Sequence, residues 1–310
     1  MTRPLRSLLI GDCDFYFSPF IHGVAAACGK LGILHSQINI RATASLIAQR
    51  IEDVQPDLIW GHMLLWPPGG APPVPALLDL CAKARKRGAF VAIHDGDIKE
   101  KTRWAQDVSG AVDLALCNHR HDRIQWRVPV MHWPYAAFPQ DDLAPPREDW
   151  RCEVAFAGQL GRGIYDTRTR LVEGMKGSGL KVWIFDGTPA TGGNTLLRTP
   201  DLAASATCVL GAGRPEVAGW LDTRVFQYPG AGAILLHDDV GGFLEPWVHY
   251  APYVGGSVAS ATDAARRVIA LSDADQHTMR LRALAHVQAR HSYTARVQQV
   301  IDARAGREVG

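Results

Sequence analysis

Short apolar runs alternate with longer amphipathic segments along the whole chain, a pattern typical of β–α units around a largely parallel sheet. Gly32 and Gly88 follow predicted helices, and Pro56 precedes a predicted strand, so turn residues mark several of the boundaries. The predicted strands are residues 7–12, 57–62, 89–94, 113–117, 128–132, 153–158, 181–186, 206–210 and 233–236. The predicted helices are residues 18–31, 76–87, 262–272 and 273–304.

The pattern starts again near residue 153, after a stretch at 138–149 with three prolines and four acidic residues that we interpret as a linker. With 310 residues in the chain and about 150 in an average domain, we predict two Rossmann-like α/β domains facing across a cleft, residues 1–148 and 149–310. The last helix is a candidate to cross back to the first domain. Ligands of such folds bind beyond the carboxyl ends of the strands, so the cleft is the expected site.

Composition narrows the class of protein only slightly. The formal net charge of +2 does not demand a polyanionic partner. The six cysteines are dispersed without a C-x-x-C pair, which indicates reduced core thiols rather than a zinc site. The chain has no signal-peptide pattern near Met1 and no apolar run of about 18 residues, so we expect a cytoplasmic protein without a membrane span.

The loop after the strand 153–158 has a sequence suited to phosphate binding. Gly158 and Gly161 would let backbone N–H groups approach an anion, and Arg162 and Arg168 would neutralise it near the start of a helix. These residues are therefore candidates for binding a diphosphate.

Two other interpretations of this loop stay open. Its spacing is G-x-x-G-x-G, not the G-x-G-x-x-G of dinucleotide-binding proteins, but Asp186 ends the next strand, where a Rossmann acid would bind ribose. An NAD(P)-linked enzyme is thus an alternative. A tight strand-to-helix turn without any ligand is the other.

A second arginine precedes a second glycine turn farther along the chain. Arg224 opens a short helical segment, Phe226 and Gln227 follow, and Gly230 and Gly232 lead into an apolar strand. This pattern resembles the C-terminal half of GT-B glycosyltransferases of the group 1 type, most closely the CgeB-like group. The family usually carries Glu, which holds the donor ribose, where this chain has Gln227.

The resemblance implies a donor site in the second domain for a nucleotide-diphosphate sugar, with a UDP-sugar expected. By likeness, Arg224 would contact the diphosphate, the turn from Gly230 to Gly232 would lie against the nucleotide, and Gln227 would meet the ribose. Such enzymes neutralise the departing diphosphate with cationic side chains and helix termini. The site would therefore need no metal and no cofactor besides the nucleotide-sugar co-substrate.

Polar residues after strands of the first domain are the candidates for the acceptor side. His94, Asp95 and Asp97 end one predicted strand, and a histidine or aspartate there could take a proton from an acceptor hydroxyl. Asp95 and Asp97 also have the D-x-D form that binds Mn²⁺ in GT-A enzymes, and they could simply cap the next helix. Asp12, Asp14 and His22 are candidates to line the same edge.

We therefore expect a glycosyltransferase that acts on a hydroxyl or amine of a small molecule, a protein or a nucleic-acid base, with retention or inversion left open. A basic and aromatic stretch at 118–127 allows a nucleic-acid acceptor such as a DNA base, as in the phage glucosyltransferases of this fold, or is a solvated face. The alternatives are a non-catalytic, two-lobed sugar- or nucleotide-binding protein and the NAD(P)-linked enzyme.

Overall fold

The computed structural model describes residues 3–13, 19–65, 67–95, 108–118, 126–161, 163–185, 198–212 and 221–307. The chain divides into two compact units, residues 1–135 with 296–310 and residues 136–295. The domain boundary expected at residues 148 and 149 therefore lies inside the second unit. The C-terminal residues return to the first unit.

The first unit contains a six-stranded parallel sheet with strand order β2-β1-β3-β4-β5-β6. Its strands are β1 (Arg6–Gly11), β2 (Leu34–Asn39), β3 (Leu58–His62), β4 (Phe90–Asp95), β5 (Leu114–Cys117) and β6 (Val130–His132). The chain crosses from one side of β1 to the other between β2 and β3, as in doubly wound folds. All six carboxyl ends consequently lie along one edge of the sheet.

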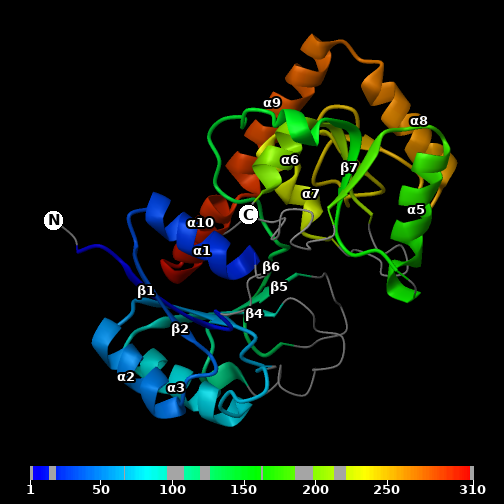
Figure 1. Ribbon diagram of the computed structural model, residues 1–310. Coiled ribbons are helices and arrows are strands. Elements are labelled where there is room, and N and C mark those ends of the chain that lie inside the picture. The colour runs from blue at the N-terminus through cyan, green and yellow to red at the C-terminus, as the bar shows by residue number, and fades with distance from the viewer. Residues whose placement is uncertain are drawn as a thin grey trace. The chain divides into compact units, whose positions relative to one another are not determined.

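Helices cover both faces of this sheet (Figure 1). They are α1 (Pro19–Lys30), α2 (Ala44–Val54), α3 (Val74–Lys86) and α10 (Tyr293–Arg304). Successive strand residues point to opposite faces: Leu8 and Ile10 join the core beneath α2 and α3, which lie on one face in Figure 1. On the other face, Phe20 of α1 packs edge-on against Trp60.

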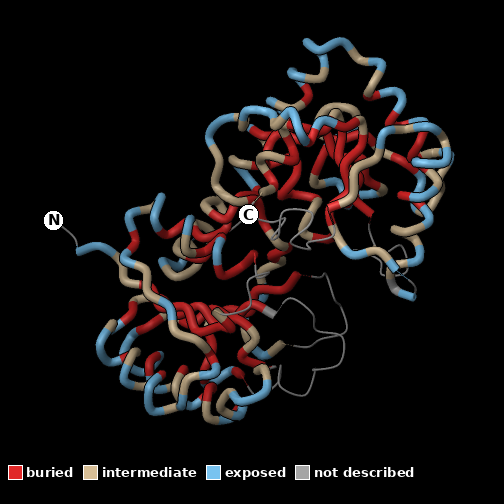
Figure 2. Tube along the Cα trace, in the orientation of Figure 1, coloured by how far each residue is buried: buried red, intermediate tan, exposed pale blue. Residues whose placement is uncertain are grey.

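The second unit contains a five-stranded parallel sheet with strand order β11-β10-β9-β7-β8. Its strands are β7 (Cys152–Ala157), β8 (Val182–Phe185), β9 (Ala206–Leu210), β10 (Leu235–His237) and β11 (Tyr250–Pro252). Its helices are α5 (Asp166–Gly177), α6 (Thr199–Ser205), α7 (Arg224–Gln227), α8 (Val258–Ile269) and α9 (Asp273–Arg290). Separate apolar clusters cover the two faces of this sheet, and buried residues follow its strands in Figure 2.

All nine strands predicted from apolar runs are present, with ends that differ by at most two residues. The single helix predicted for residues 273–304 is wrong, because it is two helices separated at His291 and Ser292. There the backbone pairs with Ala137, which accepts from the Tyr293 amide and donates to the His291 carbonyl. Ser292 Oγ also accepts from the Ala295 amide at 3.2 Å, as an N-cap does.

The stretch interpreted as a linker belongs to the second unit and is hydrogen-bonded to α9. Gln288 of α9 donates to the carbonyl of Phe138 at 2.9 Å and accepts from the amide of Gln140 at 3.2 Å. The cysteines of the described residues are free thiols, as predicted, and five of the six are buried. Among the helices of the described residues, none combines the length and apolar composition needed to cross a bilayer.

Candidate functional site

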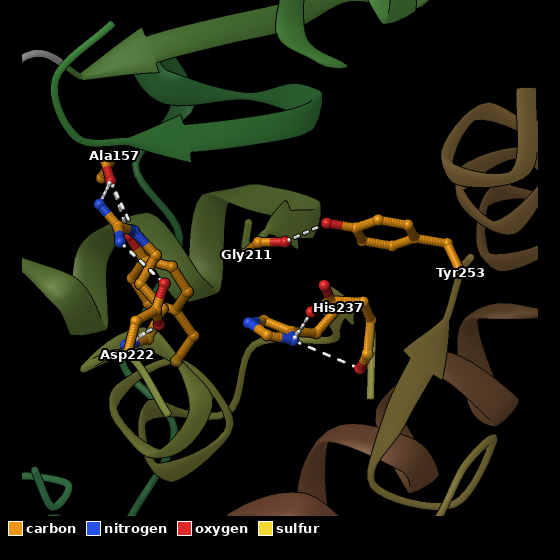
Figure 3. Close-up of polar contacts among 8 residues, drawn as sticks. Ala157, Gly211, Asp222, His237 and Tyr253 are labelled. Carbon is orange, nitrogen blue, oxygen red and sulfur yellow. Dashed lines mark hydrogen bonds and ion pairs between the residues drawn. The ribbon is translucent and has the colours of Figure 1, made fainter. Parts of the chain in front are cut away.

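The carboxyl edge of the second sheet gathers polar side chains from several elements (Figure 3). The strands run parallel, so the residues after β7, β9, β10 and β11 meet at one edge, and the segment before α7 joins them. We call these side chains the carboxyl-edge cluster: Asp222, Arg224, Tyr228, His237, Asp238 and Tyr253.

Arg224 is the best-connected member of the carboxyl-edge cluster. Its Nε and Nη2 donate to the carbonyl of Ala157 at 2.9 and 2.7 Å, and its Nη1 donates to the Asp222 carboxylate at 3.0 Å. Burial opposes both charges and is the largest single influence on each group, but the partner's charge acts together with hydrogen bonds and other nearby charges, so the pKa of Arg224 is raised and that of Asp222 is lowered. The pair is therefore ionised and joins α7 to the end of β7.

The residue after β7 is Gly158, and both its backbone conformation and its close neighbour require a glycine there. Its φ of +150° is a conformation that residues with a Cβ rarely adopt, and a Cβ here would overlap the guanidinium of Arg224. The structure thus brings together the first glycine loop and the second arginine, which the sequence placed in one site. Their contact is a packing and hydrogen-bonding contact within the protein, and the predicted contact of Arg224 with a diphosphate stays a prediction.

Two buried tyrosines donate hydrogen bonds to backbone carbonyl groups at this edge. Tyr253 Oη donates to the carbonyl of Gly211 at 2.8 Å, and Tyr228 Oη donates to the carbonyl of Ala157 at 3.5 Å. Burial raises the pKa of both hydroxyls above the ordinary value. Both side chains consequently stay protonated near neutral pH and act as donors.

His237 ends β10 and is almost completely buried, with 1% of its side chain exposed. Its Nδ1 lies 2.7 Å from a carboxylate oxygen of Asp238. Burial lowers the pKa of His237, but the hydrogen bond to Asp238 and the charge of Asp222 outweigh burial and raise it. Sequence reasoning missed both His237 and Asp222, although a polar residue at the end of an apolar strand was the available signal for His237.

Gln227 lies inside the core of the second unit, with 3% of its surface exposed. Its position on α7 is the third after Arg224, and its Nε2 has no hydrogen-bond partner within the part of the chain that the structure describes. The predicted contact with a donor ribose stays a prediction.

Gly230 and Gly232 lie before β10, at the edge of the sheet opposite to the carboxyl ends. A Cβ on Gly230 would overlap Ala137 and Val287, and a Cβ on Gly232 would overlap Leu143. Packing therefore fills the space around both glycines. The structure does not bring this turn together with the glycine loop after β7, because the turn and the loop lie at opposite edges of the sheet, and the predicted contact of the turn with a nucleotide stays a prediction.

The loop after β7 leads into α5 through one helical turn. Thr169 Oγ1 accepts from the amide of Gly161 at 2.9 Å, which fixes the loop against the helix. Arg168 stands 5.5 Å over the ring of Tyr165, and its charge lowers the pKa of Asp222. Arg168 is thus close enough to the carboxyl-edge cluster to act on it electrostatically. The candidates Arg162 and Asp186 lie outside the described residues.

Two of the acceptor-side candidates share the carboxyl edge of the first sheet. Asp12 is buried after β1 and accepts from Arg41 Nη2 at 3.0 Å. His94 is the residue before the last one of β4, where its ring stacks on Phe20 with centroids 4.4 Å apart, beside His62 at 5.7 Å. Packing among aromatic rings accounts for this position, and the role of His94 as a base stays a prediction.

Among the remaining acceptor-side candidates, the structure describes the side chain of His22, which is exposed on α1. Asp14, Asp97 and the side chain of Asp95 lie outside the described residues. The D-x-D interpretation is therefore not tested, and within the described ranges no group of three or more His, Cys, Asp or Glu residues could hold a metal ion.

A family model described as glycosyl transferase-like matches residues 186–302. The search of curated protein sequences gave no match. The family match confirms the resemblance inferred from the sequence, and the closer likeness to the CgeB-like group stays a prediction. The matched segment contains every member of the carboxyl-edge cluster.

Solved structures share the fold over nearly the whole chain. A glycosyltransferase from Rickettsia africae ESF-5 superposes with a TM-score of 0.57 at 8% identity, over 98% of this chain and 99% of that one. Anabaena HepE in complex with UDP-glucose gives 0.60 at 11% identity, over 97% and 100%. A DNA-modifying β-glucosyltransferase, solved with and without uridine diphosphoglucose, gives 0.57 at 10% identity, over 97% and 100%.

These identities are low, so the structural matches establish the fold and leave the chemistry to the site. They confirm the prediction of an α/β protein with two parallel-sheet units. The C-terminal part of this chain matches the glycosyl transferase-like family, and the whole chain has the fold of solved GT-B glycosyltransferases.

Proposed function

We propose that this protein is a glycosyltransferase that moves a sugar from a UDP-sugar to an acceptor hydroxyl or amine. One observation carries the proposal: the segment that matches the glycosyl transferase-like family supplies the whole carboxyl-edge cluster. The carboxyl edge is where ligands bind in open parallel sheets. The complexes with UDP-glucose of proteins that share this fold support a uridine nucleotide as donor.

The residues at this edge are suited to an anion. A nucleoside diphosphate leaves with negative charge that the protein must stabilise, and fixed cations and N–H groups do so without a metal. Arg168 reaches the carboxyl-edge cluster electrostatically from α5, and the ion pair of Arg224 with Asp222 holds the end of β7 in place. We propose that the nucleotide-sugar is the co-substrate and that no other cofactor takes part.

The donor site is tested by UDP-release kinetics with a panel of UDP-sugars and of small-molecule and DNA acceptors. We expect at least one UDP-sugar to be turned over, and turnover to survive removal of divalent metal by a chelator. Binding of UDP without any turnover would favour the non-catalytic binding protein instead. Binding of NAD(P) and of no uridine nucleotide would contradict the proposal.

A matched pair of variants on α5 locates the donor. Arg168→Ala removes a charge that acts on the carboxyl-edge cluster, whereas Arg170, two residues on, is exposed and contacts the carbonyl of Gly256. Loss of one charge-assisted hydrogen bond to a phosphate costs about 1.5–3 kcal/mol. We therefore expect KM for the UDP-sugar to rise about tenfold or more in Arg168→Ala and to stay near the wild-type value in Arg170→Ala.

A further inference from the structure

The carboxyl-edge cluster contains a buried nitrogen atom that forms no hydrogen bond with the described part of the chain. The Nε2 of His237 is buried and, within the described residues, has no hydrogen-bond partner, whereas Arg224 and Tyr253 are hydrogen-bonded. A buried polar atom without a partner is costly, and such atoms are rare in folded proteins. Its presence at the edge where ligands bind calls for a partner that comes from outside the chain.

The fold holds the imidazole in one orientation. Nδ1 lies 2.7 Å from the Asp238 carboxylate and 3.3 Å from the Asp238 carbonyl, which leaves Nε2 on the far side of the ring. A Cβ on Gly211, the residue after β9, would overlap Cδ2 of His237. The absence of a side chain at Gly211 therefore makes room for the imidazole ring. Figure 3 shows the ring extending from β10 toward the side on which Asp222 lies.

We propose that His237 binds the diphosphate of the nucleotide donor through its Nε2–H. This inference rests on the proposed function and names the residue that supplies the cation. A protonated imidazole donates from both nitrogens, so Nδ1–H donates to the Asp238 carboxylate and Nε2–H is directed to a phosphate oxygen.

Charge in the surrounding elements favours this assignment. Asp238 follows His237, Asp222 lies just before α7, and Arg224 is the first residue of α7. Tyr253 follows β11, and Arg168 acts from α5. The positive charge of Arg224 is already opposed by Asp222 at 3.0 Å. Although burial disfavours the imidazolium, Asp238 and Asp222 raise the pKa of His237 above its ordinary value, which extends the pH range in which it is charged.

The test compares UDP affinity by calorimetry in the wild type and two variants. His237→Gln keeps a donor of similar reach but cannot carry charge, and His277→Gln is the matched control, since His277 is exposed on α9. Between about pH 7 and pH 9 the terminal phosphate is almost fully ionised, because its last pKa is near 6. Wild-type affinity should then fall, by about tenfold in all, as the pH rises through the pKa of His237.

In His237→Gln, we expect UDP to bind about tenfold more weakly near pH 7, with a flat profile up to about pH 9. His277→Gln should behave as the wild type. A wild type that binds no UDP would overturn the proposed function itself. A wild type that binds UDP, with His237→Gln equal to it in affinity and slope, would overturn only the role of His237.

A measurement on the unaltered protein covers the case in which His237→Gln does not fold. Histidine nitrogen signals followed by NMR during UDP titration report the bonding of Nε2 directly. Because Nε2 is enclosed by protein atoms, UDP must displace some of them to reach it. We expect the Nε2 signal of His237 to shift and the pKa of its ring to rise with bound UDP; an unchanged Nε2 signal would overturn the proposal.

Discussion

Arg224 shows how one side chain organises the candidate site. It is 67 residues from Ala157 in the chain, yet two of its nitrogens share that carbonyl and a third meets Asp222. A guanidinium presents five N–H groups in a fixed plane, so it can join a strand end and a carboxylate at once. Because Gly158 has no side chain, it leaves the space that the guanidinium of Arg224 occupies.

Replacing Gly158 should therefore cost more than replacing another glycine of the same loop. In Gly158→Ala the new methyl group overlaps Arg224, and overpacking costs about 1–3 kcal/mol. Gly161 has nearly the same φ, +151°, but no atom near its would-be Cβ, so Gly161→Ala carries only the backbone strain. Chemical unfolding of both variants measures the difference, and equal losses would show that Gly158 does not accommodate Arg224.

Among the elements, most strands were predicted from the sequence, whereas only some of the residues at the candidate site were. Nine apolar strands follow from hydrophobic pattern alone. In contrast, β2 is a partly exposed edge strand with polar residues, and β11 is a short edge strand that ends in Pro252, so neither was predicted. The arginine of α7 reaches the carboxyl edge, whereas its glycine turn lies at the other edge. The chain runs from the carboxyl edge to the opposite edge through α7 and the turn that follows it, so the two ends of the motif lie apart, and sequence spacing does not reveal that.

The attachment of α7 to β7 should depend on the charge of Asp222. Asp222→Asn leaves the guanidinium of Arg224 largely buried without its counter-charge, which costs about 3–5 kcal/mol. The matched control is Glu173→Gln, which breaks the exposed pair with Lys176 and should cost about 0.5 kcal/mol or less. Unfolding at neutral pH measures both changes, and similar losses in the two variants would contradict a structural role for the buried pair.

The same pair should give the wild type a stability that depends on pH. The pKa of Asp222 is lowered on folding from 3.8, so its contribution is complete above 3.8 and is lost as the pH falls through the folded-state value. Asp222→Asn should lack this part of the acid sensitivity. Thermal unfolding between about pH 2 and pH 5 measures it, and parallel curves for the two proteins would contradict the assignment.

For the whole molecule, composition and pattern predicted two α/β units but not where the chain passes between them. Proline and acidic residues at 138–149 are typical of a linker, yet this stretch hydrogen-bonds to α9. The end of α9 could not be seen in helical periodicity, because pairing with Ala137 interrupts the helix at that point. The packing of residues 138–149 and the end of α9 both depend on contacts between segments that are far apart in the sequence.

Burial of the thiols gives a prediction for the whole molecule. Burial raises the pKa of Cys28 and Cys152 to about 11 and that of Cys81 to about 12, and the thiolate is the reactive form. Cys13 is the partly exposed one among the six. A thiol reagent at about pH 8 should label Cys13 first, and Cys13→Ser should abolish this fast phase. Rapid labelling of several thiols would contradict the packing of the cores.

Hydrogen exchange with and without UDP shows whether a uridine nucleotide binds at the carboxyl edge of the second sheet. We expect slower exchange on UDP binding in peptides around Gly158, Gly211 and Asp238, and no change around Gly232 at the opposite edge. Protection at the cavity of the first unit lined by Arg85 and Arg304, or no protection anywhere, would contradict it.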